Sequence, residues 1–426
     1  MKSNVLPKPE TSEQHQPHNP APAPSMMDIL RSYPDFRMLS IGTVGSQASQ
    51  WILNITLGWF MLELTDSALY VGMLGFAAGI PMILTSIPAG IVLDRFDRRR
   101  VLVACQIGMF CVAIGLLAAI ASDVAGPWYL LAGSFCFGAL MAMNNAGRQT
   151  IVPATVPRPA LPAAFGLTSA AMHASRIVGP SVAGVLIGLS GVSAALVFLL
   201  GILAAAIWAS VQLSPETGGT ADRGPTPGGL LDGVTYVRQN RLVLHLALLA
   251  AIPMFFVFPY LQLLPVIARD ILEIGPDGLG IMLAMSGVGA IAGGLLTERA
   301  SKIGPLGLFV LIATIAYGGI ILVVAFSTTV WLTIPAIMTG SMTGSMFQSL
   351  NNTLFQLQLD DDVRGRATGV YMLGFGTYAL GGLPLGFLAD AISPSAAIAF
   401  GAIASSSIAL LLTVRSDELR ALRIDS

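Results

Sequence analysis

The sequence predicts an all-α membrane protein whose twelve transmembrane helices form two parallel six-helix repeats. Three observations lead to this prediction: an apolar composition, a series of apolar runs long enough to cross a bilayer, and a charged motif that occurs once in each half. Of the 426 residues, 54% are hydrophobic and 11% are charged, whereas a soluble protein has about 25% charged residues. The composition therefore excludes a soluble globular protein.

Apolar runs of membrane-spanning length recur along the whole chain. Each transmembrane helix needs about 20 apolar residues to cross a hydrocarbon core of about 30 Å. Twelve runs meet this requirement, at 38–62, 68–93, 101–121, 128–147, 160–189, 192–213, 242–268, 278–297, 305–326, 330–354, 366–389 and 394–414. They divide the chain into a disordered tail (1–34), a six-helix bundle (35–213), a linker (214–241), a second six-helix bundle (242–415) and a tail (416–426).

A charged motif separates the second and third apolar runs. It consists of Gly90, Asp94, Arg95, Arg98 and Arg99. A second copy in the other half, formed by Gly294, Glu298, Arg299 and Lys302, keeps the same spacing and lies 204 residues further on. A repeat of this kind is typical of transporters that consist of two parallel halves.

The first copy of the motif resembles the loop signature of the major facilitator superfamily. Segments 64–72, 145–153 and 175–180 are in addition similar to the branch that holds the enterobactin exporters and the macrolide efflux proteins. The resemblance implies the major facilitator fold and efflux of a small amphipathic molecule driven by the proton gradient. One feature departs from it: the arginine found midway along the fourth span of many proton antiporters has no match in residues 133–141.

The resemblance also implies a gate on the inner side. In the family, the carboxylate that corresponds to Asp94 lies against the N-terminus of the eleventh helix, which carries about half a positive charge. The gating residues expected here are Gly90, Asp94, Arg95, Arg98, Arg99, Glu298, Arg299 and Arg366. The alternative for this loop is a topology anchor with no role in gating.

A second motif lies in the fifth apolar run. Gly179, Pro180 and Gly184 resemble the antiporter motif of the superfamily, which is associated with export. Pro180 removes a backbone donor, and the small residues let a neighbouring helix approach closely. The alternative is an ordinary kink, but the motif and its position favour an exporter over an importer.

The basic residues are distributed unequally between the two sides of the predicted bundle. Of the 22 Lys and Arg residues, 20 fall on the side of the two termini and only Arg269 on the other. This asymmetry predicts a multi-pass protein of the inner membrane with both termini, the linker and the tails in the cytoplasm. Apolar residues within 230–240 recur on one face of a helix, which predicts that the linker carries an amphipathic helix.

Ionisable residues inside the apolar runs are few, and Arg176 stands near the middle of the fifth run. A charge there costs about 2.5–3.5 kcal/mol on insertion scales, and it normally faces a cavity or the bundle interior. We therefore expect Arg176 to bind a substrate anion, with His173 on the same face; the alternative is a structural arginine. None of the 23 acidic residues lies near the middle of a run, so no buried carboxylate is predicted to bind a cationic drug.

The first apolar run carries a polar stripe at helical spacing, formed by Gln47, Gln50, Trp51 and Asn54. Such a stripe is expected to face a substrate cavity rather than lipid. Hydrogen bonding between helices is the alternative, and it is favoured for the asparagine pairs Asn144–Asn145 and Asn351–Asn352.

These residues lead to one preferred function and one alternative. The preferred function is efflux of a siderophore-like or anionic aromatic molecule, and the alternative is a multidrug or macrolide efflux pump for neutral or cationic drugs. The sequence has no metal-binding, nucleotide-binding or cysteine-pair motif, so we expect no enzymatic activity, metal or cofactor. The expected partners are the lipid bilayer, a small-molecule substrate and protons, with no nucleic acid, and the chain is expected to be a monomer.

Overall fold

The computed structural model describes residues 26–85, 89, 92–93, 95–218, 230–300, 306–360 and 363–422, and all regular structure within them is helical. The helices of the first half are α1 (Met26–Ser32), α2 (Pro34–Thr65), α3 (Ala68–Leu84), α5 (Arg98–Ala121), α6 (Pro127–Thr155), α7 (Leu161–Ser190) and α8 (Val192–Val211). Those of the second half are α9 (Leu230–Gln239), α10 (Arg241–Phe256), α11 (Leu264–Val266), α12 (Gly275–Ala300), α13 (Leu306–Phe326), α14 (Val330–Leu357), α15 (Arg364–Ala391), α16 (Pro394–Arg415) and α17 (Asp417–Ala421).

Eight helices in the described part of the chain are long and apolar enough to cross a membrane. The predicted first, fourth and tenth runs coincide with α2, α6 and α14, and the second begins with the shorter apolar helix α3. The prediction of a multi-pass all-α membrane protein is therefore confirmed. The count of twelve spans and the division into two six-helix repeats stay predictions.

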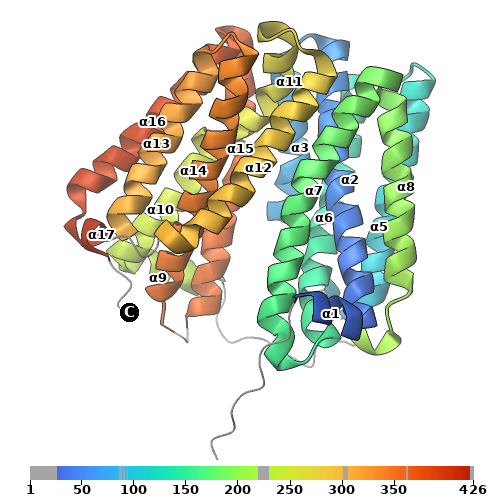
Figure 1. Ribbon diagram of the computed structural model, residues 1–426, viewed down its shortest axis with the longest axis horizontal. Helices are drawn as coiled ribbons and strands as arrows, with labels where there is room; N and C mark the ends of the chain where they lie inside the picture. Colours follow the sequence, from blue (N-terminus) through green and yellow to red (C-terminus); the bar gives the residue numbers. More distant parts are fainter. Residues whose placement is uncertain are drawn as a thin grey trace, which may run out of the picture.

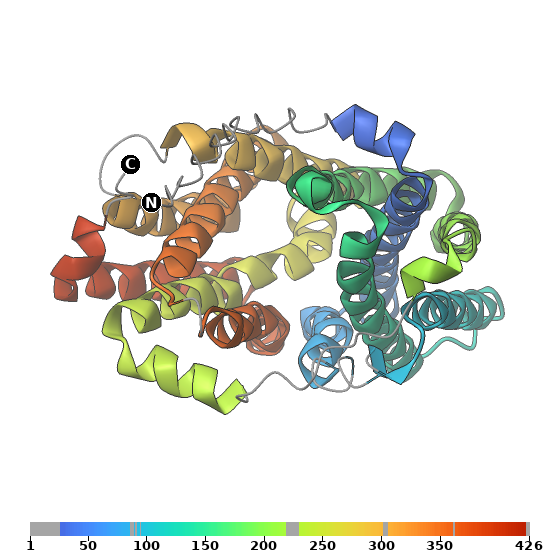
Figure 2. The ribbon, with the colours of Figure 1, turned by 90° about the horizontal axis from the view of Figure 1, so that it is seen from below.

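The helices form two bundles that lie side by side (Figures 1 and 2). In the first, α2 packs against α7 and α8, and α5 packs against α6; in the second, α14 packs against α12 and α13, and α13 against α16. Two helix pairs connect the bundles, α3 with α15 and α7 with α12. We call the face on which α1 lies in Figure 1 the terminal face, and the other end of the helices the opposite face.

Both predicted tails contain helix. Within the predicted N-terminal tail, α1 buries Ile29 completely, and α2 already begins at Pro34. Within the predicted C-terminal tail, α17 is capped by the hydroxyl of Ser416 and buries Leu419 completely. Short helices with one buried apolar residue are held by packing against a bundle, which no local pattern in the sequence indicates.

The seventh predicted run, 242–268, lies within a candidate span at Arg241–Ile271, and this span is not one continuous α-helix. After α10 the chain continues as a 3₁₀-helix, η3 (Phe258–Leu263), then α11, then a π-helical turn, η4 (Ile267–Ile271). Pro253 lies near the end of α10, and Pro259 and Pro265 lie in the segment that follows it; each lacks the backbone N–H that an α-helix needs. The backbone therefore changes helix type within the span.

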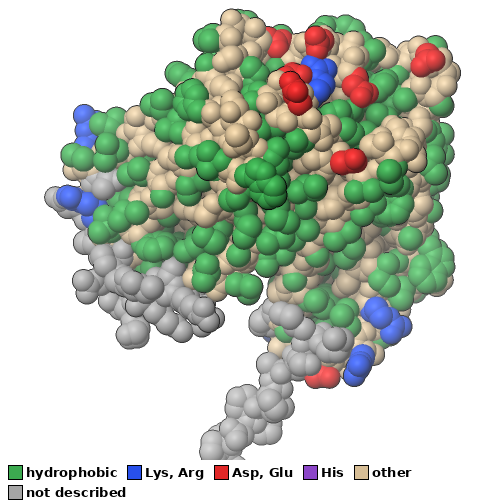
Figure 3. Space-filling view, turned by 45° about the horizontal axis from the view of Figure 1, so that its top comes forward, with side chains coloured by type: hydrophobic (Ala, Val, Ile, Leu, Met, Phe, Trp, Pro, Cys, Tyr) green, Lys and Arg blue, Asp and Glu red, His purple; other side chains and the backbone are tan. Residues whose placement is uncertain are grey.

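On the opposite face, two sets of polar contacts join the bundles; together we call them the clasp. The Asp390 carboxylate at the end of α15 accepts hydrogen bonds from the Ser67 hydroxyl and from the backbone N–H of Ala68, the latter at 2.6 Å. Arg269 forms an ion pair with Asp66 and donates to the carbonyl of Leu62 at 2.9 Å. Figure 3 shows acidic side chains gathered on this face.

Candidate functional site

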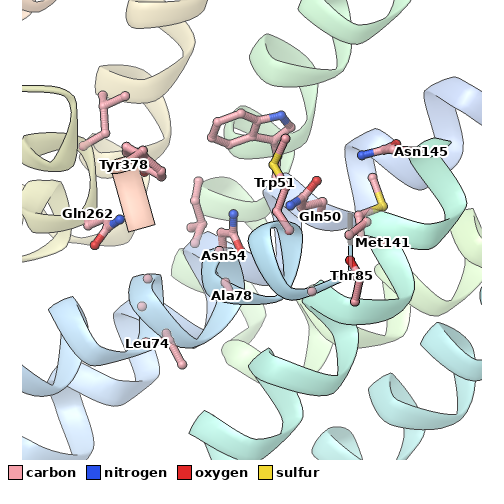
Figure 4. A pocket seen from close by; sticks show the side chains of 18 of the residues that line it. Gln50, Trp51, Asn54, Leu74, Ala78, Thr85, Met141, Asn145, Gln262 and Tyr378 are labelled. Atoms are coloured by element: carbon pink, nitrogen blue, oxygen red, sulfur yellow. The ribbon is translucent and has the colours of Figure 1, made fainter. Parts of the chain in front are cut away.

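A cavity of about 460 Å³ lies between the two bundles. Helices α2, α3, α6, α11, α12 and α15 and the 3₁₀-helix η3 contribute to its wall (Figure 4). The polar and aromatic side chains of the wall are Gln50, Trp51, Asn54, Thr85, Asn145, Gln149, Gln262 and Tyr378. None of the wall residues in the described part of the chain carries a formal charge.

Three residues of the polar stripe lie in this wall. Gln50, Trp51 and Asn54 come from adjacent turns of α2 and face the cavity (Figure 4). Gln47, one turn earlier, is 6% exposed and lies inside the bundle instead of in the wall. Whether the three wall residues bind a substrate stays a prediction.

Arg176 lies next to the aromatic part of the wall. Its guanidinium carbon is 5.3 Å from the ring centroid of Trp51, which is within the range of a cation–π interaction. Within the described part of the chain, Arg176 forms no ion pair with a carboxylate. The positive charge of Arg176 therefore lies directly behind Trp51, beside a cavity whose described wall residues are all neutral. The side chain of His173 lies outside the described residues.

The predicted gate is described only in part. Gly90 and Asp94 lie outside the described residues, as do the side chains of Glu298 and Arg299. Arg95 is exposed.

The other two arginines of the motif, Arg98 and Arg99, contact helix carbonyls. Arg98 donates to the carbonyl of Thr150 at 3.4 Å, and Arg99 donates to that of Val211, the last residue of α8. Basic side chains at a helix C-terminus are favourable because its free carbonyls carry partial negative charge. These two arginines thus connect the start of α5 to the last part of α6 and to the C-terminus of α8, and only Arg99 contacts a terminal carbonyl.

Arg366, the predicted gating residue on α15, contacts the linker helix α9. Its Nη1 lies 3.4 Å from Oδ2 of Asp232. The Tyr236 hydroxyl donates to Asp360 at 3.2 Å, and a Cβ on Gly233 would lie 2.5 Å from the backbone carbonyl oxygen of Arg366. The linker helix is therefore held tightly against the second bundle.

The predicted antiporter motif lies where α7 meets two other helices. A Cβ on Gly179 would lie 3.1 Å from the backbone oxygen of Ala48 in α2. A Cβ on Gly184 would lie 2.7 Å from Cα of Gly280 in α12, across the interface between the bundles. The absence of side chains at these two glycines thus permits the close contact of α7 with α2 in its own bundle and with α12 in the other.

We expect Gly184→Leu to destabilise the contact between α7 and α12. A leucine there overlaps the α12 backbone, and overpacking of this kind costs about 1–3 kcal/mol. The melting temperature of the purified protein should fall by several degrees. Gly201→Leu is the matched control, because a side chain at Gly201 in α8 would meet nothing within 4 Å. Equal melting temperatures for the two variants would contradict the close contact.

Arg148 is not a loop residue, although the charge distribution placed it among the bases of the terminal side. It is 4% exposed within α6 and donates to the carbonyl of Leu39 at 3.1 Å, to the Thr43 hydroxyl at 3.0 Å and to the Ser46 hydroxyl at 2.9 Å. The amide oxygen of Gln106, oriented to satisfy its neighbours, also accepts from Arg148. Partners on α2 and α5 therefore keep this charge inside the bundle.

The asparagine pairs differ in their surroundings. Asn351 is fully buried and donates to the carbonyl of Leu246 at 3.0 Å and to the Tyr371 hydroxyl at 3.1 Å, which are contacts between helices. Asn144 is also fully buried, whereas its neighbour Asn145 lies in the cavity wall.

Two wall residues of the second bundle, Gln262 and Tyr378, were not among the predicted site residues. Gln262 is the only amide in its apolar run, and the run of Tyr378 contains no amide, so neither run shows a stripe of amides like that of the first run. The available signal was the group of three prolines around Gln262, because interrupted helices often line binding sites in transporters.

Comparison with known proteins shows one matching family and several related transporters. The family model described as transmembrane secretion effector matches residues 30–424. The chain is 26% identical to the staphyloferrin A transporter of Staphylococcus aureus over 80% of this chain and 86% of that one. It is 24% identical to the enterobactin exporter EntS of Salmonella typhi (93% and 96%) and 24% identical to macrolide efflux protein A of Streptococcus pyogenes (61% and 65%).

The fold is also found among solved structures. A bacterial homologue of the human lysosomal transporter Spinster, in an inward-facing and unoccupied conformation, superposes with a TM-score of 0.68 at 15% identity. The similarity covers 89% of this chain and 94% of that one. At this identity the match concerns the fold alone.

Proposed function

Because the chain belongs to the transmembrane secretion effector family of the major facilitator superfamily, and is a membrane transporter rather than an enzyme, we propose that it exports a small amphipathic molecule. The observation that carries this proposal is the cavity between the bundles. Its volume of about 460 Å³ lies within the range of small-molecule sites, about 300–1,000 Å³. Its mixed aromatic and amide wall suits a molecule with both apolar and polar parts.

The preferred substrate is a siderophore-like or anionic aromatic molecule. An aromatic ring would stack on Trp51 or Tyr378, and its negative charge would be attracted by Arg176, whose guanidinium is 5.3 Å from the Trp51 ring. The names of two relatives, an enterobactin exporter and a staphyloferrin A transporter, support this choice.

Efflux of neutral or cationic drugs is the second candidate. Among the described residues, the wall of the cavity contains amides, hydroxyls and aromatic rings but no charged side chain, and such a wall suits a neutral compound. The similarity to a macrolide efflux protein and to the multidrug efflux pump Tap of Mycolicibacterium fortuitum supports this alternative.

Export would proceed by alternating access. In the proposed cycle, the halves formed by residues 35–213 and 242–415 rock against each other, and the clasp closes the opposite face. The terminal face, with both termini, would lie in the cytoplasm, and the predicted gate around Asp94 would close it. The proton gradient would drive the cycle in a monomer.

Arg176→Gln is expected to reduce export of an anionic aromatic substrate about tenfold, because the positive charge next to Trp51 is lost. The measurement compares metabolites inside and outside cells that lack the protein with those of cells complemented by the wild type or the variant. Arg176→Lys is the control that keeps the charge, and it should retain more export than Arg176→Gln. If secretion is unchanged in all strains and cells without the protein become sensitive to lipophilic drugs, drug efflux replaces the preferred function.

A further inference from the structure

The side chain of Gln262 lies at the contact between the two bundles. It extends from η3 into the space between Gly75 of α3 and Gly382 of α15. A Cβ on either glycine would collide with the Gln262 carboxamide. The two glycines therefore leave room for this amide at a position where helices from both bundles meet.

The carboxamide of Gln262 makes no hydrogen bond of good geometry among the described residues, although the Tyr378 hydroxyl lies close to it. Both its oxygen and its nitrogen are buried from solvent, and neither atom has a well-formed hydrogen bond. More than about 90% of buried polar groups in folded proteins are paired, because an unpaired one loses its hydration without compensation. Gln262 also belongs to the cavity wall, so a molecule in the cavity lies against its side chain.

The backbone around Gln262 provides a second, independent observation. The seventh span changes from α-helix to 3₁₀-helix at Phe258 and includes a π-helical turn at Ile267–Ile271. Departures from α-helical geometry within a span are typical of ligand-binding positions in transporters and are tolerated where they line a cavity. The broken helix and the unpaired amide thus indicate the same place.

We propose that Gln262, together with the neighbouring Tyr378, binds a neutral substrate group that carries a hydrogen-bond donor next to an acceptor, such as a carboxamide. A carboxamide side chain has one acceptor and two donor hydrogens, so its best complement is a group of the same kind. An anion would pair with the nitrogen and leave the oxygen of Gln262 unpaired. This inference rests on the proposed function, because it names the part of the exported molecule that the second bundle recognises.

Figure 4 shows how this subsite relates to the rest of the cavity. Gln262 and Tyr378 lie on one side, Trp51 and Gln50 on the other, and Asn54 between them. A substrate that spans the cavity therefore contacts the aromatic wall of the first bundle with one end and Gln262 with the other. Because the two ends touch different bundles, the substrate contacts both of the halves that move in the proposed cycle.

The test measures binding of two matched probes, salicylamide and methyl salicylate, to the full-length protein in lipid nanodiscs by equilibrium dialysis. Both are neutral aromatic compounds, but only salicylamide presents an amide. The wild type is expected to bind salicylamide about tenfold more tightly, because methyl salicylate cannot donate from an amide to the oxygen of Gln262. Empty nanodiscs correct for partition of the probes into lipid.

Gln262→Met keeps the unbranched side chain that fits between the glycines but removes both polar atoms of the amide. We expect it to abolish the preference for salicylamide and to change methyl salicylate binding by less than about threefold. Gln262→Leu, which also lacks both polar atoms, should also lose the preference and serves if the methionine variant is unstable. Gln212→Leu, at the exposed end of α8, is the control and should keep the wild-type preference.

Two outcomes would overturn the subsite: equal binding of the probes by the wild type, or an unchanged preference in both Gln262 variants. Failure of the proposed function has a different signature. Cells that secrete the same compounds with and without the protein would contradict export, while a salicylamide preference that depends on Gln262 would still support the subsite.

Discussion

Arg148→Ala is expected to lower the stability of the protein more than any other substitution considered above. The change removes three hydrogen bonds from α6 to α2 and leaves a cavity in the first bundle. Replacement of a large buried side chain by alanine costs about 2–5 kcal/mol, and each lost hydrogen bond adds about 1 kcal/mol. The yield of folded protein should fall. Losses of this size should lower the melting temperature by about ten degrees or more.

The measurement is thermal unfolding of the purified variants in detergent, followed by size-exclusion chromatography. Arg158→Ala is the control, since Arg158 is exposed and lies only ten residues further along the chain. Arg148→Lys should fall between the wild type and alanine, because a single ammonium cannot reproduce the fork of donors that a guanidinium presents. A melting temperature for Arg148→Ala equal to that of Arg158→Ala would show that the buried network contributes nothing to stability.

The second large effect concerns the clasp, where Asp390 accepts from the N-terminus of α3. In Asp390→Ala, α3 loses the hydrogen bond from Ala68 and the favourable interaction of a carboxylate with a helix N-terminus. Together these contributions amount to about 1.5–3 kcal/mol, so the closed arrangement of the opposite face should become at least about tenfold less populated relative to the open one.

A cysteine in the cavity can report this opening. The reporter is Val71→Cys, which lies in the cavity wall and is 3% exposed, in a chain whose three native cysteines are replaced by serine. Asp390→Ala should raise its rate of labelling by a membrane-impermeant maleimide added from the opposite face about tenfold. Asp123→Ala is the control, since Asp123 is an exposed acidic residue in the turn between α5 and α6 and does not belong to the clasp. Equal labelling in the two variants would contradict the role of the clasp.

Much of the helical layout and part of the cavity wall could be predicted from the sequence, because both depend on local patterns. Long apolar runs locate helices in a membrane since every backbone polar group must be paired there. The spacing of Gln50, Trp51 and Asn54 corresponds to one face of an α-helix, and the structure places all three in the cavity wall. In these cases the information lies within a single helix.

The features that sequence analysis missed depend on contacts between helices. Arg148 looks like a loop base until the hydroxyls of Thr43 and Ser46, more than 100 residues earlier in the chain, are placed around it. Gln262 is one amide in an apolar run, and it becomes a candidate site residue only when Gly75 and Gly382 are placed on either side of it. Such partners come from distant parts of the chain, and periodicity within a run does not identify them.

The docking of α9 onto α15 has a practical consequence for following the transport cycle. Through Gly233, the Asp232–Arg366 ion pair and the Tyr236–Asp360 hydrogen bond, α9 is attached to the second bundle, whereas α1 packs against α2 and α7 of the first. A fluorophore on the exposed face of each of these two short helices would therefore travel with a different half of the molecule. The efficiency of energy transfer between the two dyes would report the distance between the halves during the transport cycle, with both dyes outside the transmembrane helices.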